Sequence, residues 1–126
     1  MRRIFSGAAA PVIAAVAVVA MSGEAQAKPA DGDWQGCPYG AVCIYGQNVN
    51  PWADPHPTVV YWSYGAHNLS GQYGNHWFVN NQYGGAGVSL CTGYDGATCH
   101  RFLDAQYAQY AESVDLTSYN SITLNR

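Results

Sequence analysis

The chain has 126 residues with four cysteines, and its five basic residues stand against eight acidic ones, for a formal net charge of −3. Binding to the phosphate backbone of nucleic acid or to an anionic membrane needs clustered lysine and arginine, and this composition excludes both. An aromatic content of 13% predicts instead that large side chains supply much of the core.

The first 27 residues have the layout of a secretory signal peptide. Two arginines precede an apolar run over residues 8–20, which is too short to cross a bilayer of about 30 Å as a helix. Ala25-Gln26-Ala27 follows, with small residues at the first and third positions of a cleavage site. Removing 27 of the 126 residues leaves a mature chain of 99 residues that begins at Lys28, with three basic and seven acidic residues and a net charge of −4. We expect this chain to be secreted and monomeric.

The mature chain divides into a short arm and one domain. Residues 28–35 contain proline and aspartate without periodicity, which predicts a flexible N-terminal arm. The ordered domain is then expected over residues 36–126, a length that suits one small domain and not two.

Short strand patterns dominate the domain. In residues 41–45 the side chains alternate, with Val42 and Ile44 on one face, which is the period of a half-buried strand. Five further segments that are alternating or rich in β-branched and aromatic residues are predicted to be strands: residues 58–63, 76–80, 88–92, 99–103 and 121–124.

Loops and one helical segment separate these strands. Proline, glycine and asparagine mark residues 46–57 and 64–75 as loops. Residues 104–113 are expected to form a short helix or a wound loop, because apolar and aromatic residues recur there at intervals of three and four.

A weak internal repeat divides the domain into two halves. The residues from Asn68 to His76 align with those from Asp115 to Ser121 when two residues are dropped, and an apolar strand follows each copy. A strand that contains a cysteine lies about 25 residues upstream of each copy. Two related halves of three or four short strands each predict two Greek-key motifs that close into a sandwich.

All four cysteines lie in the exported part, and an even number in a small secreted domain predicts two disulfides. The spacings C-x5-C and C-x7-C favour the local bridges Cys37–Cys43 and Cys91–Cys99, because short loops close at low entropic cost. A long-range framework such as Cys37–Cys99 is the alternative. Local bridges would each stiffen one loop of the domain.

The opening of the domain resembles that of a known family. Residues 36–45 read GCPYGAVCIY. They are similar to a motif of small secreted bacterial proteins that are grouped with a metallopeptidase inhibitor of βγ-crystallin-like fold. In that motif, C-P-x-G-x-x-C is followed by Leu or Ile and then by Tyr or Trp. Residues 88–94 and 120–124 also resemble that group. The resemblance implies an all-β domain in which two Greek-key motifs form a βγ-crystallin-like sandwich with local disulfides.

The resemblance also implies a function, because the inhibitor presents a loop to the active site of a thermolysin-like zinc peptidase. Its reactive bond follows the first cysteine of the second half, so the matching inhibitory loop here comprises Cys91, Thr92, Gly93 and Tyr94. The family places a bulky apolar residue after that cysteine. Thr92 is small and polar, so an enzyme pocket that prefers a large apolar side chain should hold this loop poorly. The expected partner is a secreted peptidase of the zinc-dependent class.

A carbohydrate- or cell-wall-binding module, or part of an antimicrobial protein, is the alternative from another class. Four tryptophans and ten tyrosines, with few charges, can stack on sugar rings while asparagines bond their hydroxyls. Trp62 and Trp77 fall in predicted strands and are expected in the core. Trp52 lies in a proline-rich loop and is the candidate for an exposed contact with a cell-wall polysaccharide.

No catalytic, cofactor or metal site is expected. The cysteines should be oxidised, no G-x-S-x-G or H-E-x-x-H motif occurs, and the four histidines are scattered along the chain. Residues 116–121, which correspond to a calcium-binding stretch of βγ-type domains, lack the carboxylate pair that a hard cation needs. The sequence therefore predicts a binding protein and not an enzyme.

Overall fold

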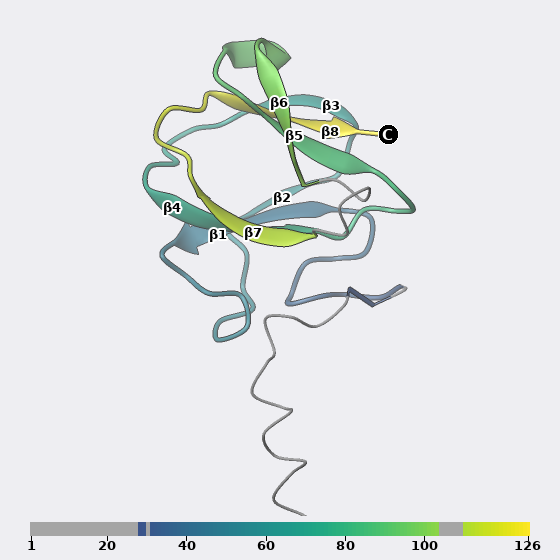
Figure 1. Cartoon of the computed structure of the whole chain (residues 1–126). Helices are drawn as coiled ribbons and strands as arrows, with labels where there is room; N and C mark the ends of the chain where they lie inside the picture. Colours follow the sequence, from purple (N-terminus) through teal and green to yellow (C-terminus); the bar gives the residue numbers. More distant parts are fainter. Residues whose placement is uncertain (1–27, 30, 104–109) are drawn as a thin grey trace, which may run out of the picture.

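Two antiparallel four-stranded sheets make up the computed structural model, which describes residues 28–29, 31–103 and 110–126 (Figure 1). The first sheet has the strand order β2-β1-β4-β7, formed by Val59–Tyr61, Val42–Gln47, Asn75–Asn80 and Ala111–Asp115. The second has the order β3-β8-β5-β6, formed by Gly65–Asn68, Ser121–Asn125, Gly87–Cys91 and Cys99–Leu103. The predicted signal peptide, residues 1–27, lies outside the described residues.

The main hydrophobic core lies between the two sheets, which Figure 1 shows as two layers. Both sheets contribute aliphatic or aromatic side chains, and all of these are buried: Val42, Ile44, Phe78, Val88, Leu90, Leu103, Leu116, Ile122 and Leu124. Alternation along β1 directs Val42 and Ile44 into this core, as the sequence predicts. The all-β expectation is confirmed.

The outer face of the first sheet is also covered. Cys43 and Tyr45, which alternate with the core residues of β1, are buried with Trp34 in a second cluster. The Tyr45 hydroxyl donates to the Gln35 carbonyl at 2.6 Å, and its burial raises the pKa of this phenol. Strand β1 is therefore buried on both faces, whereas its alternation predicts a strand with one exposed face.

Two described residues of the segment expected to be a flexible arm, residues 28–35, contact the domain: Lys28 and Trp34. Trp34 is only 8% exposed and forms a two-way backbone bridge with Cys37. The Lys28 ammonium lies 5.6 Å from the Tyr39 ring centroid and 5.4 Å from that of Tyr110. Aromatic contacts that periodicity does not reveal thus hold a segment that lacks any strand pattern.

Each half of the domain contributes its third strand to the sheet of the other half. Strand β3 of the first half joins β5, β6 and β8, and strand β7 of the second half joins β1, β2 and β4. Equivalent bonds follow these strands, because Leu69 N–H donates to the Asn120 carbonyl and Leu116 N–H to the Gly74 carbonyl, each at 2.9 Å. The segments that align in the sequence repeat therefore occupy equivalent positions in the two halves.

Both predicted disulfides are present and local, which removes the long-range alternative. Cys37 is bonded to Cys43 within the outer cluster of the first sheet. Cys91 is bonded to Cys99 directly across the β5–β6 pair, with the two Cα atoms 3.9 Å apart. Each bridge thus connects neighbouring backbone segments within one half of the domain.

Two of the expected elements differ in the structure. Strand β3 lies inside the predicted loop 64–75, where a glycine and polar residues hide the strand pattern. The short helix or wound loop expected over residues 104–113 is wrong for residues 111–113, which belong to β7, while residues 104–109 lie outside the described part. Pairing of β7 with β4 over five residue pairs overrides the local helical spacing.

Candidate functional site

The predicted inhibitory residues lie together on the β5–β6 hairpin, which we define as residues 91–99. The Cys91–Cys99 disulfide closes its base. Above the disulfide, Thr92 N–H donates to the Thr98 carbonyl at 3.1 Å and Gly93 N–H to the Ala97 carbonyl at 3.0 Å. The ladder continues toward the tip, where a single 3-10 turn, η2, spans Tyr94–Gly96.

The turn at the tip requires backbone conformations that few residues adopt. Asp95 has φ 56° and Gly96 has φ 77°, both in the left-handed region. Aspartate tolerates this region better than most residues, and glycine has no steric penalty there. A Cβ at Gly96 would also lie 3.0 Å from the Cβ of Ala66. The Asp95-Gly96 turn therefore packs closely against β3.

Side chains outside the hairpin hold its tip in place. The Asn68 amide accepts a hydrogen bond from Asp95 N–H at 2.8 Å and donates one to the Asp95 carboxylate at 3.0 Å. The Ser121 hydroxyl donates to the Gly93 carbonyl at 2.6 Å and accepts from Gly96 N–H at 3.1 Å. These contacts come from the end of β3 and the start of β8, so both halves of the domain support the hairpin.

The resemblance implies that the Cys91–Thr92 peptide bond is the reactive bond. The carbonyls of both residues accept hydrogen bonds from within the protein. Cys91 is fully buried and its carbonyl accepts a hydrogen bond from Asn120 N–H at 3.0 Å. The Thr92 carbonyl accepts a second bond, from the Asn120 side chain, at 2.7 Å. Thr92 itself is exposed, and Tyr94 at the tip is 60% exposed. The hairpin thus exposes side chains to solvent, while the carbonyls of Cys91 and Thr92 remain hydrogen-bonded to Asn120.

Trp52, the expected exposed aromatic contact, is half-buried. Its ring packs edge-on against Trp34, with centroids 6.1 Å apart, and against Trp77, with centroids 5.4 Å apart. The expectation that Trp62 lies in the core is wrong, because strand β2 ends at Tyr61 and Trp62 is 57% exposed. Trp77, also expected in the core, is half-buried against the outer cluster, so Trp62 is the more exposed of these three tryptophans.

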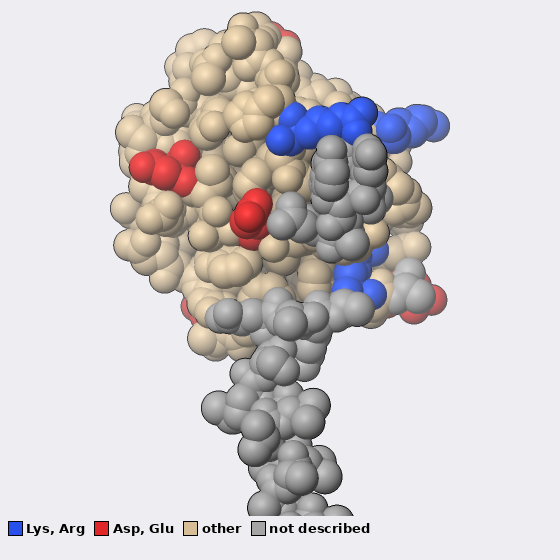
Figure 2. Space-filling view, in the orientation of Figure 1, with Lys and Arg blue, Asp and Glu red and all other residues tan. Residues whose placement is uncertain are grey.

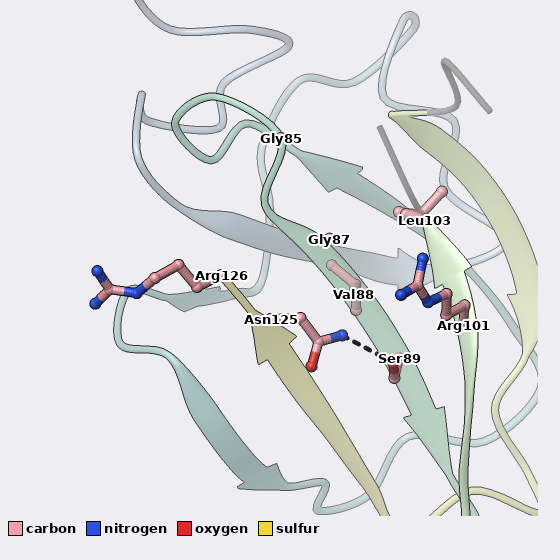
Figure 3. Close-up of a pocket in the computed structure, with 8 residues that line it drawn as sticks. All are labelled: Gly85, Gly87, Val88, Ser89, Arg101, Leu103, Asn125 and Arg126. Atoms are coloured by element: carbon pink, nitrogen blue, oxygen red, sulfur yellow. Dashed lines mark hydrogen bonds between the residues drawn. The ribbon is translucent and has the colours of Figure 1, made fainter. Parts of the chain in front are cut away.

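A hollow of about 320 Å³ lies beside β5, β6 and the end of β8 (Figure 3). The Asn125 side chain donates to the Ser89 hydroxyl at 2.8 Å, and Figure 3 shows Arg126 extending away from the other side chains that line the hollow. Apart from Arg101, the polar side chains that line the hollow are thus either bonded to each other or point away from it, so we favour the hairpin as the site.

Charge is sparse around these features. Figure 2 shows that acidic and basic groups cover only a minor part of the face in view. Within the described ranges, no cluster of three or more His, Cys, Asp or Glu residues could hold a metal ion, and no helix is long and apolar enough to cross a membrane. No family model, curated protein or solved structure matches the chain.

Three supporting residues of the hairpin are absent from the sequence-based site: Asn68, Asn120 and Ser121. Each bonds a hairpin residue that lies 25 to 28 positions away in the chain. The signal that could have found them is the internal repeat, whose two copies run through these three residues. The repeat marks the loops that meet the hairpin.

Proposed function

We propose that this chain is a secreted binding domain of the βγ-crystallin-like type, and that it inhibits a peptidase through the Cys91–Cys99 hairpin. The exchange of third strands between the two halves supports a pair of interlocked Greek-key motifs. Two disulfides support a destination outside the reducing cytoplasm. The likeness of residues 36–45 to the inhibitor group supports the choice of a peptidase as partner.

The observation that carries this proposal is a hairpin tip that is both fixed and exposed. Tyr94 is 60% exposed, while the neighbouring backbone is held by the disulfide and by Asn68, Asn120 and Ser121. A contact element that already has its bound conformation loses little entropy on binding. Tyrosine is among the residues that most often dominate the energy of a protein interface.

The contact uses side chains and not the Cys91–Thr92 bond. Asn120 engages the carbonyls of both residues, so a substrate-like approach of either carbonyl to a zinc ion would first break a hydrogen bond. The side chains of Thr92 and Tyr94 are exposed, and the Thr92 hydroxyl makes only a long hydrogen bond, to the Thr98 carbonyl at 3.5 Å. The hairpin therefore blocks the peptidase cleft by occupying it and needs no cleavage.

An inhibition assay against secreted peptidases, with thermolysin-like zinc enzymes included, tests the proposal. Tyr94→Ala should weaken inhibition at least about tenfold, since it removes the aromatic contact. Tyr83→Ala is the matched control, because Tyr83 is 55% exposed and precedes β5 at the end opposite to the hairpin. If both variants inhibit equally well, the hairpin is not the contact with the peptidase.

A second variant tests the mismatch at Thr92. Thr92→Leu should tighten inhibition of a zinc peptidase with a large apolar pocket by about three- to tenfold, because each buried methylene contributes about 0.8 kcal/mol. If neither the wild-type chain nor Thr92→Leu inhibits any peptidase of the panel at tens of micromolar, the inhibitor function is rejected.

A further inference from the structure

A cleft of about 220 Å³ adjoins the hairpin and shares Tyr94 and Asn120 with the proposed peptidase contact. Three loops form its walls: the β3–β4 loop, the β7–β8 loop and the tip of the hairpin. The residues that matter for its chemistry are Gln72, Tyr73, Tyr94, Thr117, Tyr119 and Asn120. The first two loops are the equivalent loops of the two halves, so the cleft lies where the repeat brings its copies together.

The lining of this cleft is polar and uncharged. None of the residues that line it is Asp, Glu, Lys or Arg. Amide groups such as those of Gln72 and Asn120 carry both donors and acceptors of hydrogen bonds, which suits a ligand that carries many hydroxyls. The Thr117 hydroxyl already accepts from Gly74 N–H and donates to the Asp115 carboxylate, so it shapes the wall of the cleft. Without a charged partner, the cleft offers little to a phosphate or a carboxylate.

Two tyrosine rings at the cleft are available for stacking. Tyr73 is 64% exposed and Tyr94 is 60% exposed, so both leave aromatic surface in water. Tyr119 is more enclosed, with its ring centroid 5.6 Å from that of His100. A ligand that combines an apolar C–H face with a rim of hydroxyls would cover these rings and satisfy the amides together.

We propose that this cleft binds one ring of a neutral saccharide. Its volume is below the roughly 300–1,000 Å³ of pockets that enclose drug-sized ligands, so it accommodates a single ring while the rest of the polymer extends outside. The site goes beyond the proposed peptidase contact and differs from the Trp52 contact that composition indicates.

The walls of the cleft are held before any ligand arrives. Gly74 N–H donates to the Thr117 hydroxyl at 2.9 Å, which joins the two equivalent loops. Leu69 N–H donates to the Asn120 carbonyl at 2.9 Å, and the Asn120 side chain bonds the Thr92 carbonyl of the hairpin. Binding of a sugar ring therefore orders few protein groups, which favours useful affinity from a small contact.

The competing ligand class is a quaternary ammonium ion, which aromatic cages bind through cation–π contacts. Such an ion has no hydroxyls for Gln72 and Asn120, and the cleft supplies no carboxylate to balance its charge. We therefore favour the saccharide, and choline serves as the probe that distinguishes the two.

Calorimetric titration of the disulfide-bonded mature chain with cellohexaose, chitohexaose and choline chloride tests this proposal. At least one oligosaccharide should bind saturably, and Tyr73→Ala should weaken that binding about tenfold. Tyr73→Phe keeps the ring face and should retain most of the affinity. Tyr83→Ala, which removes a similarly exposed ring outside the cleft, should change nothing. Because Tyr73 is exposed, neither Tyr73 variant should lower the melting temperature.

Three outcomes would overturn the saccharide site. In the first, neither oligosaccharide binds at about 10 mM. In the second, an oligosaccharide binds but Tyr73→Ala leaves its affinity unchanged. In the third, choline binds and neither sugar does. Tyr73 lies outside the hairpin, so Tyr73→Ala should still inhibit a peptidase as the wild type does. The saccharide site and the peptidase contact can therefore fail independently.

Discussion

Ser121 shows how one buried side chain supports the hairpin. Its hydroxyl donates to the Gly93 carbonyl and accepts from Gly96 N–H, and the residue is fully buried. Ser121→Ala leaves both backbone groups without this partner, so the free energy of unfolding should fall by about 1–3 kcal/mol. Urea unfolding measures the change. Ser118→Ala, at an exposed position, should stay within about 0.5 kcal/mol of wild type. Equal stability of the two variants would contradict this role.

Asp115 provides a pH-dependent test of the loop that joins the two halves. Hydrogen bonds from the Thr117 hydroxyl and then from its backbone N–H hold the pKa of Asp115 below its ordinary value of 3.8. A carboxyl with a lowered pKa stabilises the folded state above the unfolded-state value, and this contribution is lost as the pH falls through the folded-state pKa.

Thr117→Val removes the hydroxyl donor and keeps the N–H donor, so the pKa of Asp115 should rise part of the way toward 3.8. Titration of the Asp115 carboxyl carbon by NMR measures it. Thr117→Ser keeps a hydroxyl and should leave the pKa low. A pKa in Thr117→Val that matches wild type would show that the hydroxyl bond does not form.

At the scale of elements, the two disulfides should contribute similar stability and different function. Each closes a short loop, for which chain entropy gives about 2–3 kcal/mol. The double variant Cys91→Ala/Cys99→Ala should weaken peptidase inhibition as well as stability. Cys37→Ala/Cys43→Ala should lower stability alone, because that bridge lies in the outer cluster of the first sheet. Inhibition assays at a temperature where both variants stay folded distinguish them, and equal loss of inhibition would refute a local stiffening role.

Strands with alternating or β-branched and aromatic residues could be predicted from the sequence, whereas two of the four edge strands, β3 and β7, could not. The alternation of Val42 and Ile44 locates β1, and the predicted bounds of β6 match the observed ones. Strands β3 and β7 lie at sheet edges and none of their residues is fully buried, so their sequences carry no clear hydrophobic period. Both were missed for the same reason, since they are the equivalent strands of the two halves.

The candidate site could be predicted only where its residues are close in the chain. The spacing of Cys91 and Cys99 indicates the bridge and hence the hairpin. The support from Asn68 depends on a contact across 27 residues, which local patterns do not encode. Exposure of Trp62 depends on the end of β2 at Tyr61, and strand ends are poorly defined by composition.

At the scale of the whole molecule, the exchanged strands should make the two halves unfold together. All four tryptophans precede β5, so their fluorescence reports the first half, while far-UV circular dichroism reports both. Leu116 lies in the second half and is fully buried in the shared core. Leu116→Ala should lower stability by about 2–5 kcal/mol and shift both signals equally.

The equivalent residue of the first half, Leu69, is only half-buried, so Leu69→Ala should cost less than Leu116→Ala. A tryptophan transition that stays in place in Leu116→Ala while the dichroism transition moves would mean that the halves unfold separately. The exchange of β3 and β7 would then contribute little to cooperativity.

NMR titration of the isotope-labelled mature chain with secreted zinc peptidases tests most directly whether the hairpin is the binding surface. Binding should shift the amide signals of residues 92–98 most strongly, while the signals around Tyr83, which precedes β5 at the opposite end, stay unchanged. Shifts centred on Tyr83 or on another surface, or no shifts with any peptidase of the panel, would contradict the proposed role of the hairpin.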